Sequence, residues 1–181
     1  MRMILAITAA GILMGTAACS SARPPQPACD PGNGNCAPNQ AAEIELRELQ
    51  RQAEDAQHAA FNERARLTGR GGALEPTDEL RLHADGVYLE LVMAGLREQY
   101  HDGFRVEGSP TTMATAAPGE SRNGSDPRLT MEVCEDNVAT TFSEGGRLFN
   151  GIPYQGKVYA KVIDGRVKLV DATMKAVDSC A

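Results

Sequence analysis

The amino terminus has the pattern of a secretory signal, and this feature constrains the fold of the remaining chain most. Arg2 supplies a positive charge, and residues 3–14 are almost wholly apolar. Residues 15–18 then supply the small side chains of a cleavage site directly before Cys19. The apolar segment is short for a membrane span, which needs about 20 residues, so an uncleaved anchor is the less favoured interpretation. We expect the rest of the chain to fold outside the cytoplasm, where disulfides form.

The residues around Cys19 resemble the lipobox of bacterial lipoproteins. In that family small residues precede a cysteine that is alkylated by a diacylglycerol and becomes the mature amino terminus. Thr16 stands where the family usually has Leu or another aliphatic residue. Thr16 and Ala18 also suit the ordinary small-x-small signal peptidase, so cleavage without lipid is the rival interpretation. The resemblance implies a lipid anchor at the outer face of the bacterial cytoplasmic membrane.

The number of cysteines agrees with a lipid on Cys19. The chain has five cysteines, and an odd number in an exported protein leaves one thiol unpaired. If Cys19 carries lipid, then Cys29, Cys36, Cys134 and Cys180 remain, and these four can pair completely. Four cysteines allow three pairings, among which sequence alone does not choose. Turn-forming residues between Cys29 and Cys36 favour a local disulfide over a metal or redox pair.

The acidic composition excludes several kinds of partner. The chain has 18 Lys and Arg against 24 Asp and Glu, a net charge of −6. Such a chain, without a basic stripe, is not expected to bind nucleic acid. Anionic lipid headgroups would repel it as well, so lipid rather than charge should hold it to a membrane.

The first half of the mature chain is predicted to be a tether followed by helices. Residues 19–42 are rich in Pro and Gly, which is typical of a flexible tether. Residues 43–67 contain mainly strong helix formers. Their apolar stripe has spacings of three and four, and we expect it to pack on its own domain rather than on a second copy. The stripe consists of Leu46, Leu49, Ala53, Ala56 and Ala60.

A second helix is expected to begin near Thr77, a candidate cap that is followed by two acidic residues. Residues 87–93 would also suit a strand, and we favour the helix. One face of this helix would carry Leu80, Ala84, Val87, Leu91 and Ala94.

From Phe104 onward the pattern changes to short strands. Alternating apolar and polar residues over 128–137 predict a half-buried strand. Two β-rich runs over 158–170 are joined by Asp164-Gly165, which indicates a hairpin with a type I′ turn. Helices followed by antiparallel strands predict an α+β domain over residues 73–181.

The residues that carry a family resemblance are Val133-Cys-Glu-Asp136, Gly145-Gly-Arg147, Tyr159, Val162, Asp164-Gly-Arg-Val-Lys-Leu-Val170 and Cys180. This set resembles exported actinobacterial relatives of the nuclear-transport-factor-2-like superfamily. In those relatives a C-x-D strand precedes an Asp-Gly-x-Trp-Lys-Val hairpin and a closing cysteine; here Val167 stands at the Trp position. The resemblance spans about residues 78–180. It implies a cone, in which a strongly bent sheet wraps on helices around a pocket, and a disulfide between Cys134 and Cys180.

The same superfamily includes ketosteroid-isomerase-like and polyketide-cyclase-like enzymes. Those enzymes use a buried carboxylate or His as base and a Tyr or acid as oxyanion donor. Nothing in the sequence places any two candidates in one pocket, and no other catalytic motif is present. The candidates that the resemblance implies are Asp85, Tyr88, His101, Asp102 and Tyr154.

Glu135 and Asp136 are the candidates for binding a hard metal cation. Neighbouring residues of a strand point to opposite faces of the sheet, so the two carboxylates should not converge. We therefore expect neither a metal site nor a cofactor.

These patterns together predict a non-catalytic, lipid-anchored extracytoplasmic domain that binds an envelope protein or a small ligand. An isomerase-like or dehydratase-like enzyme with a cone pocket is one alternative. A structural envelope protein that self-associates through residues 43–67 is another, since the sequence leaves the oligomeric state open. The expected organisation is a signal peptide over 1–18, a tether with a small disulfide loop over 19–42, a helix and linker over 43–72, and a cone-like domain over 73–181.

Overall fold

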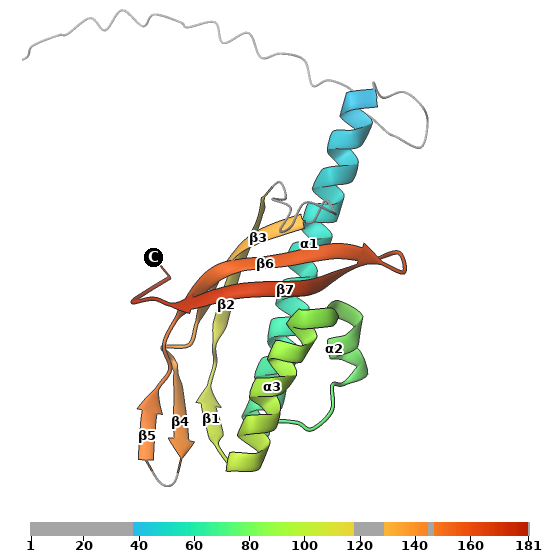
Figure 1. Cartoon of the computed structure of the whole chain (residues 1–181). Helices are drawn as coiled ribbons and strands as arrows, with labels where there is room; N and C mark the ends of the chain where they lie inside the picture. The colour runs from blue at the N-terminus through green and yellow to red at the C-terminus, as the bar shows by residue number, and fades with distance from the viewer. Residues whose placement is uncertain (1–37, 118–128, 145–146, 181) are drawn as a thin grey trace, which may run out of the picture.

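The computed structural model of the chain describes residues 38–117, 129–144 and 147–180. Within these ranges three helices pack against antiparallel strands, which confirms the predicted α+β class (Figure 1). The predicted signal peptide, the lipidation candidate Cys19 and the pair Cys29 and Cys36 lie outside the described residues. No helix in the described ranges combines the length and apolar character that crossing a membrane requires.

Helix α1 extends from Pro38 to Gly69 and is the longest element. It begins before the predicted start at Glu43, so residues 38–42 of the expected tether are helical. Proline is favoured at the first position of a helix, because its missing N–H would have no partner there. The predicted end of this helix at residue 67 lies within one turn of the observed end.

The two halves of α1 have different surroundings. Residues 42–48 are exposed, and Figure 1 shows this part of the helix projecting beyond the other elements. From Ala53 onward the helix packs on its own domain, as predicted, because Ala53, Ala56 and Ala60 are buried, whereas Leu46 of the same predicted stripe is 41% exposed. Glu54 also accepts a hydrogen bond of 2.8 Å from the backbone N–H of Ala116, which satisfies part of an exposed strand edge.

Two helices occupy the region where one was predicted. Helix α2 spans Asp78–His83, and helix α3 spans Gly86–Asp102. The break is caused by pairing with a distant strand, because Ala84 bridges Leu169 and the N–H of Asp85 donates to the Leu169 carbonyl at 2.8 Å. Residues 87–93 are helical, as predicted.

The break rotates α3 relative to the predicted apolar face. Val87 and Leu91, which lie on the predicted apolar face, are about half exposed. Ala94 is exposed as well. The buried residues of α3 are Tyr88, Val92, Met93, Leu96 and Gln99.

Seven strands in the described ranges form two antiparallel sheets. The first has the order β1-β4-β5 and the second has the order β2-β3-β6-β7. The bounds are β1 Arg105–Gly108, β2 Thr111–Ala117, β3 Leu129–Asp136, β4 Thr140–Glu144, β5 Arg147–Asn150, β6 Tyr154–Ile163 and β7 Arg166–Ala176.

The two sheets are the arms of one bent surface. Strand β1 leads into β2, β3 leads into β4, and β5 leads into β6. In the short sheet β4 pairs with β1 and β5, just as β3 pairs with β2 and β6 in the long sheet. The short arm stands at a steep angle to the long one (Figure 1). Glycines occupy the bend because the backbone there approaches too closely for a side chain. A Cβ would lie 2.2 Å from a backbone oxygen at Gly108 and 2.0 Å from one at Gly151. This bent sheet agrees with the predicted curved sheet.

The predicted hairpin is confirmed. Strands β6 and β7 pair in the register Ile163↔Arg166, and the two residues between them have φ values of 52° and 75°. Positive φ at both central residues is the requirement of a type I′ turn, and Asp164-Gly165 meets it.

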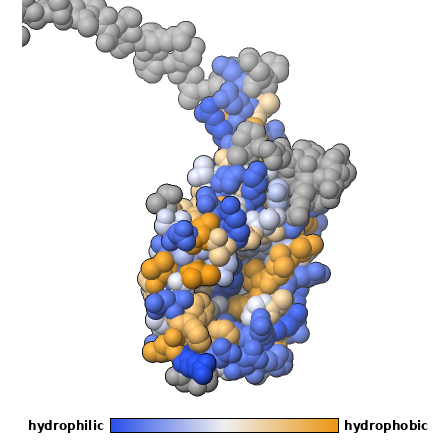
Figure 2. Space-filling model, turned by 60° about the vertical axis from the view of Figure 1, so that its left-hand side comes forward, coloured by the Kyte–Doolittle hydropathy of each residue, from blue (hydrophilic) through white to orange (hydrophobic). Residues whose placement is uncertain are grey.

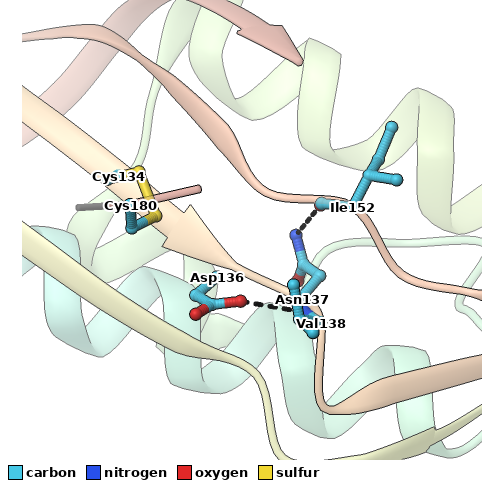
Figure 3. Close-up of a disulfide and its surroundings, with 6 residues drawn as sticks. All are labelled: Cys134, Asp136, Asn137, Val138, Ile152 and Cys180. Carbon is cyan, nitrogen blue, oxygen red and sulfur yellow. Dashed lines mark hydrogen bonds between the residues drawn. A yellow bond between two sulfur atoms is a disulfide. The ribbon is translucent and has the colours of Figure 1, made fainter. Parts of the chain in front are cut away.

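Strand β3 is buried on both faces, whereas the sequence predicted a half-buried strand. Met131 and Val133 belong to the core, but Thr130 and Cys134 are also buried. A disulfide joins Cys134 to Cys180, 46 residues later, on the face of β3 that the sequence predicted to be exposed (Figure 3). The structure therefore pairs the two cysteines as the resemblance implied.

A single apolar core includes α1 and the elements that follow residue 73. Helix α3 packs on β7, and α1 packs on β2. The core thus joins the predicted segments 43–72 and 73–181 and leaves a concave space between α1, α3 and the bent sheet.

Candidate functional site

A cavity of about 830 Å³ lies between α1, α3 and the bent sheet. This volume falls in the range of roughly 300–1,000 Å³ that small-molecule sites occupy. Figure 2 shows hydrophobic surface on both sides of a hollow in this face of the molecule. The apolar lining residues are Phe61, Ala65, Leu91, Val92, Leu96, Phe104, Val106, Pro110, Phe142, Val158, Ala172 and Met174.

An ion pair lies in this apolar wall. Nη2 of Arg64 on α1 donates to Oε2 of Glu135 on β3 at 2.6 Å. The Glu135 side chain is 9% exposed and that of Arg64 is 28% exposed. The Arg64 guanidinium also lies over the ring of Phe61, 5.2 Å from its centroid, where a cation is attracted to the aromatic face. The pair is held from two elements and is turned toward the cavity.

The ion pair keeps the Arg64 guanidinium charged. Burial disfavours its charged form, but the Glu135 carboxylate outweighs that effect and raises the pKa of Arg64. The cavity wall therefore contains a fixed positive and a fixed negative charge that neutralise each other.

Tyr88 lies beside this pair and remains protonated. Burial, opposed by the nearby Arg64 charge, raises the pKa of Tyr88 to about 12. Its hydroxyl donates to Oε1 of the fully buried Gln57 at 3.4 Å. Within the described ranges, Nε2 of Gln57 has no hydrogen-bond partner. Tyr88 is thus a neutral hydrogen-bonding group at physiological pH rather than a base.

Two further polar wall residues, Gln99 and Thr140, hold the scaffold together. Nε2 of Gln99 donates to the carbonyls of Thr68 and Phe104, at 2.7 and 3.2 Å, and so joins the end of α1 to the chain entering β1. The Thr140 hydroxyl donates to the Asn137 carbonyl at 2.6 Å. These groups are engaged in the fold, whereas Arg64 and Glu135 form the ion pair that a ligand would meet in this wall.

Two of the five predicted catalytic candidates, Tyr88 and Tyr154, line the cavity. Asp85 is the amino-terminal cap of α3, where it accepts from the N–H of Gly86 at 2.7 Å. His101 and Asp102 are exposed in the last turn of α3. The candidates that could act as a carboxylate or imidazole base therefore lie outside the cavity wall.

Glu135 and Asp136 point to different surroundings, as expected for neighbouring strand residues. Glu135 faces Arg64, whereas Oδ1 of Asp136 accepts from the N–H of Val138 at 2.9 Å in the turn after β3 (Figure 3). In that turn Nδ2 of Asn137 also donates to the Ile152 carbonyl at 3.1 Å. Among the residues that the structure describes, no three His, Cys, Asp or Glu side chains gather as metal ligands do.

Sequence reasoning missed Arg64 as a functional residue and considered Glu135 only as a metal ligand. A signal was nevertheless present on each element. Arg64 shares one helical face with the buried Gln57 and Phe61, and Glu135 is in phase with the buried Met131 and Val133 of its strand. Opposite charges that interrupt two apolar faces are expected to pair when those faces meet.

Gly95 determines how much of the cavity is open on the α3 side. It lies at the centre of the helical face that carries Tyr88, Val92 and Gln99, and all four line the cavity. A Cβ at Gly95 would have no atom within 4 Å. A larger side chain at this position would therefore enter the space that a ligand needs.

Comparisons with known proteins give no functional assignment. No protein-family model matches the chain, and no curated protein matches it. Among solved structures, the chain is similar to the intermembrane space region of the chloroplast protein ARC6, with a TM-score of 0.45 and 14% sequence identity. That alignment covers 71% of this chain and 97% of the other. The function is therefore inferred from the cavity itself.

Proposed function

We propose that the chain is a lipid-anchored, extracytoplasmic domain that binds a small, mainly apolar ligand without catalysing a reaction. The observation that carries this proposal is the cavity of about 830 Å³, whose apolar wall contains one charge-balanced ion pair. Apolar cavities with a few convergent polar groups are typical of small-molecule sites.

The arrangement of the wall favours binding over proton transfer. Glu135 is engaged by the Arg64 guanidinium, which donates to its Oε2 at 2.6 Å. Tyr88 is protonated and is already hydrogen-bonded to Gln57. Tyr88 therefore lacks the balanced pKa that general acid–base catalysis at neutral pH requires.

Two features support the proposed anchor. The small residues before Cys19 resemble a lipobox, and the exposed half of α1 would hold the cavity away from the membrane surface. Ion pairs within one helix stabilise this unsupported segment. They join Glu43 to Arg47, and Arg51 to both Glu48 and Asp55. A helix of 32 residues is about 48 Å long at 1.5 Å per residue.

The binding proposal is tested with the full chain carrying Cys19→Ser, exported and purified without detergent. Titration with N-phenylnaphthylamine, an uncharged dye that fluoresces in apolar sites, should show saturable binding to one site per chain. Leu148→Ser is the matched control, because Leu148 is 76% exposed on β5 and lies outside the cavity wall. The control should bind the dye as the parent does. Non-saturable fluorescence, or binding lost in the control, contradicts the proposal.

The anchor is tested by intact-mass analysis of the wild-type protein extracted from membranes. The expected mass is that of a chain beginning at Cys19 with a diacylglycerol attached. Comparison of reduced and unreduced samples also reports the number of disulfides. A mature mass without acyl groups would contradict anchoring and would leave the binding proposal to be judged separately.

A further inference from the structure

We propose that the ligand of the cavity is an uncharged amphiphile, an apolar molecule with a hydroxyl or amide group that lies against Arg64 and Glu135. This inference rests on the proposed binding function of the same cavity. It adds the chemical class of the ligand, which follows from the charges and hydrogen-bonding groups of the wall.

The charge balance of the wall disfavours a charged ligand. A carboxylate would be attracted to Arg64, but Glu135 lies only 2.6 Å from that guanidinium and would repel it from nearly the same place. An ammonium group would be attracted to Glu135 and repelled by Arg64. Either ion would also lose its hydration on entering an apolar cavity, without a net electrostatic gain in return. Glu98, the other acidic residue of the wall, is exposed to water, which weakens its field.

The hydrogen-bonding groups of the pair suit a neutral group that both donates and accepts. The pair joins one guanidinium nitrogen, Nη2, to one carboxylate oxygen, Oε2. This bond uses neither the other guanidinium N–H groups of Arg64 nor the second carboxylate oxygen of Glu135, Oε1. A hydroxyl or amide can accept from Arg64 and donate to Glu135 simultaneously. Such bonds to charged groups are stronger than bonds between neutral groups.

The experiment measures how well matched ligands displace N-phenylnaphthylamine from the Cys19→Ser chain at neutral pH. Decanol, decanoate and decylammonium share one alkyl chain and differ in the charge of the head group. Decanol should displace the dye at concentrations at least about tenfold lower than either ion, because each ion meets one like charge of the pair and loses its hydration on entering the cavity.

Two variants test whether the ion pair causes this preference. Glu135→Gln retains a hydrogen-bond acceptor for Arg64 but leaves the positive charge unbalanced, so the preference should shift toward decanoate. Arg64→Met leaves the negative charge unbalanced, and the preference should shift toward decylammonium. If Arg64→Met does not fold, comparison of wild type with Glu135→Gln still shows whether the ion pair causes the preference for decanol.

The outcomes separate the two proposals. Failure of the dye to bind contradicts the binding function itself. Binding of the dye together with displacement by decanoate or decylammonium at concentrations equal to or below that of decanol overturns the uncharged class and leaves the cavity as a binding site. A preference for decanol that Glu135→Gln leaves unchanged also overturns the proposal, since the pair would then not select the ligand.

Discussion

Arg64 and Glu135 are 71 residues apart in the chain, and their side chains meet at 2.6 Å in the wall of the cavity. The pair connects α1 to the central strand β3 and places two opposite charges in a mainly apolar wall. The same contact therefore contributes to both the fold and the proposed ligand preference.

Removal of one partner should destabilise the protein more than removal of both. Arg64→Met leaves the Glu135 carboxylate, which is 9% exposed, without its counter-ion. We expect a loss of about 2 kcal/mol, less than for a fully buried pair because Arg64 is partly exposed. The double variant Arg64→Met with Glu135→Leu should recover part of that loss, because no charge remains buried.

Urea unfolding measures these changes. Arg47→Met is the control, since its ion pair with Glu43 lies on the exposed half of α1 and its side chain is 73% exposed. The control should have the same free energy of unfolding as wild type. A double variant less stable than Arg64→Met would contradict this account of the pair.

The Cys134–Cys180 disulfide should contribute substantially to stability. It closes a loop of 46 residues, and the chain-entropy estimate for such a loop is about 4 kcal/mol. Cys134→Ser with Cys180→Ser should lower the free energy of unfolding by roughly that amount. In this variant a reductant should have much less effect on the urea midpoint than in wild type. Equal sensitivity to reductant would mean that another disulfide stabilises the domain.

Glu63 should stabilise the protein at neutral pH, and this contribution to the free energy of unfolding should be lost in acid. Hydrogen bonds from Arg66, supported by the Thr77 hydroxyl and opposed by burial, lower the pKa of Glu63 from 4.5 to about 2. Because the folded pKa lies below the unfolded one, this contribution is fully present above pH 4.5 and is lost as the pH falls toward 2. We expect about 1 kcal/mol, since Arg66 is partly exposed and the pair is screened by water.

Denaturant unfolding of Glu63→Gln across this pH range checks the prediction. The variant should be less stable than wild type at neutral pH, and the difference should disappear in acid. Glu48→Gln is the matched control: hydrogen bonds from Arg51 and Gln52 lower the pKa of Glu48 to about 2, but this residue lies on the exposed half of α1. A constant difference between Glu63→Gln and wild type at every pH would contradict the assignment.

The bend of the sheet should depend on Gly108. This residue has a φ of 113°, and its Cβ would lie 2.2 Å from the carbonyl oxygen of Ala139. Gly108→Ala should therefore cost about 2 kcal/mol of stability. Gly69→Ala is the control, because a Cβ there meets no atom within 4 Å. Unfolding midpoints that are equal for the two variants would contradict the proposed role of Gly108.

Local features of the fold were predictable from the sequence. The Asp164-Gly165 turn follows from backbone preferences at two adjacent positions, and the helices follow from residue type and apolar spacing. The division between α2 and α3 was missed, because it depends on pairing of Ala84 and Asp85 with Leu169, a residue of a distant strand. The burial of Cys134 on β3 was missed for a similar reason, since this residue bonds to Cys180, 46 residues later in the chain.

The site was less predictable than the fold. Of the catalytic candidates that the resemblance implied, Tyr88 and Tyr154 line the cavity, whereas Asp85, His101 and Asp102 lie outside its wall. The contribution of Arg64 depends on a partner from another element, and that juxtaposition follows only from tertiary packing. The openness of the cavity at Gly95 likewise depends on which face of α3 is turned inward.

The most direct test of the binding site is to fill the cavity at Gly95. Gly95→Leu should occupy the space next to Tyr88 and Val92, and replacement of a helical glycine should leave stability unchanged or raise it by up to about 1 kcal/mol. Affinity for N-phenylnaphthylamine should fall at least about tenfold, whereas Gly69→Leu, outside the cavity wall, should bind as the parent does. A stable Gly95→Leu chain with the affinity of the parent would contradict the assignment of the cavity as the binding site.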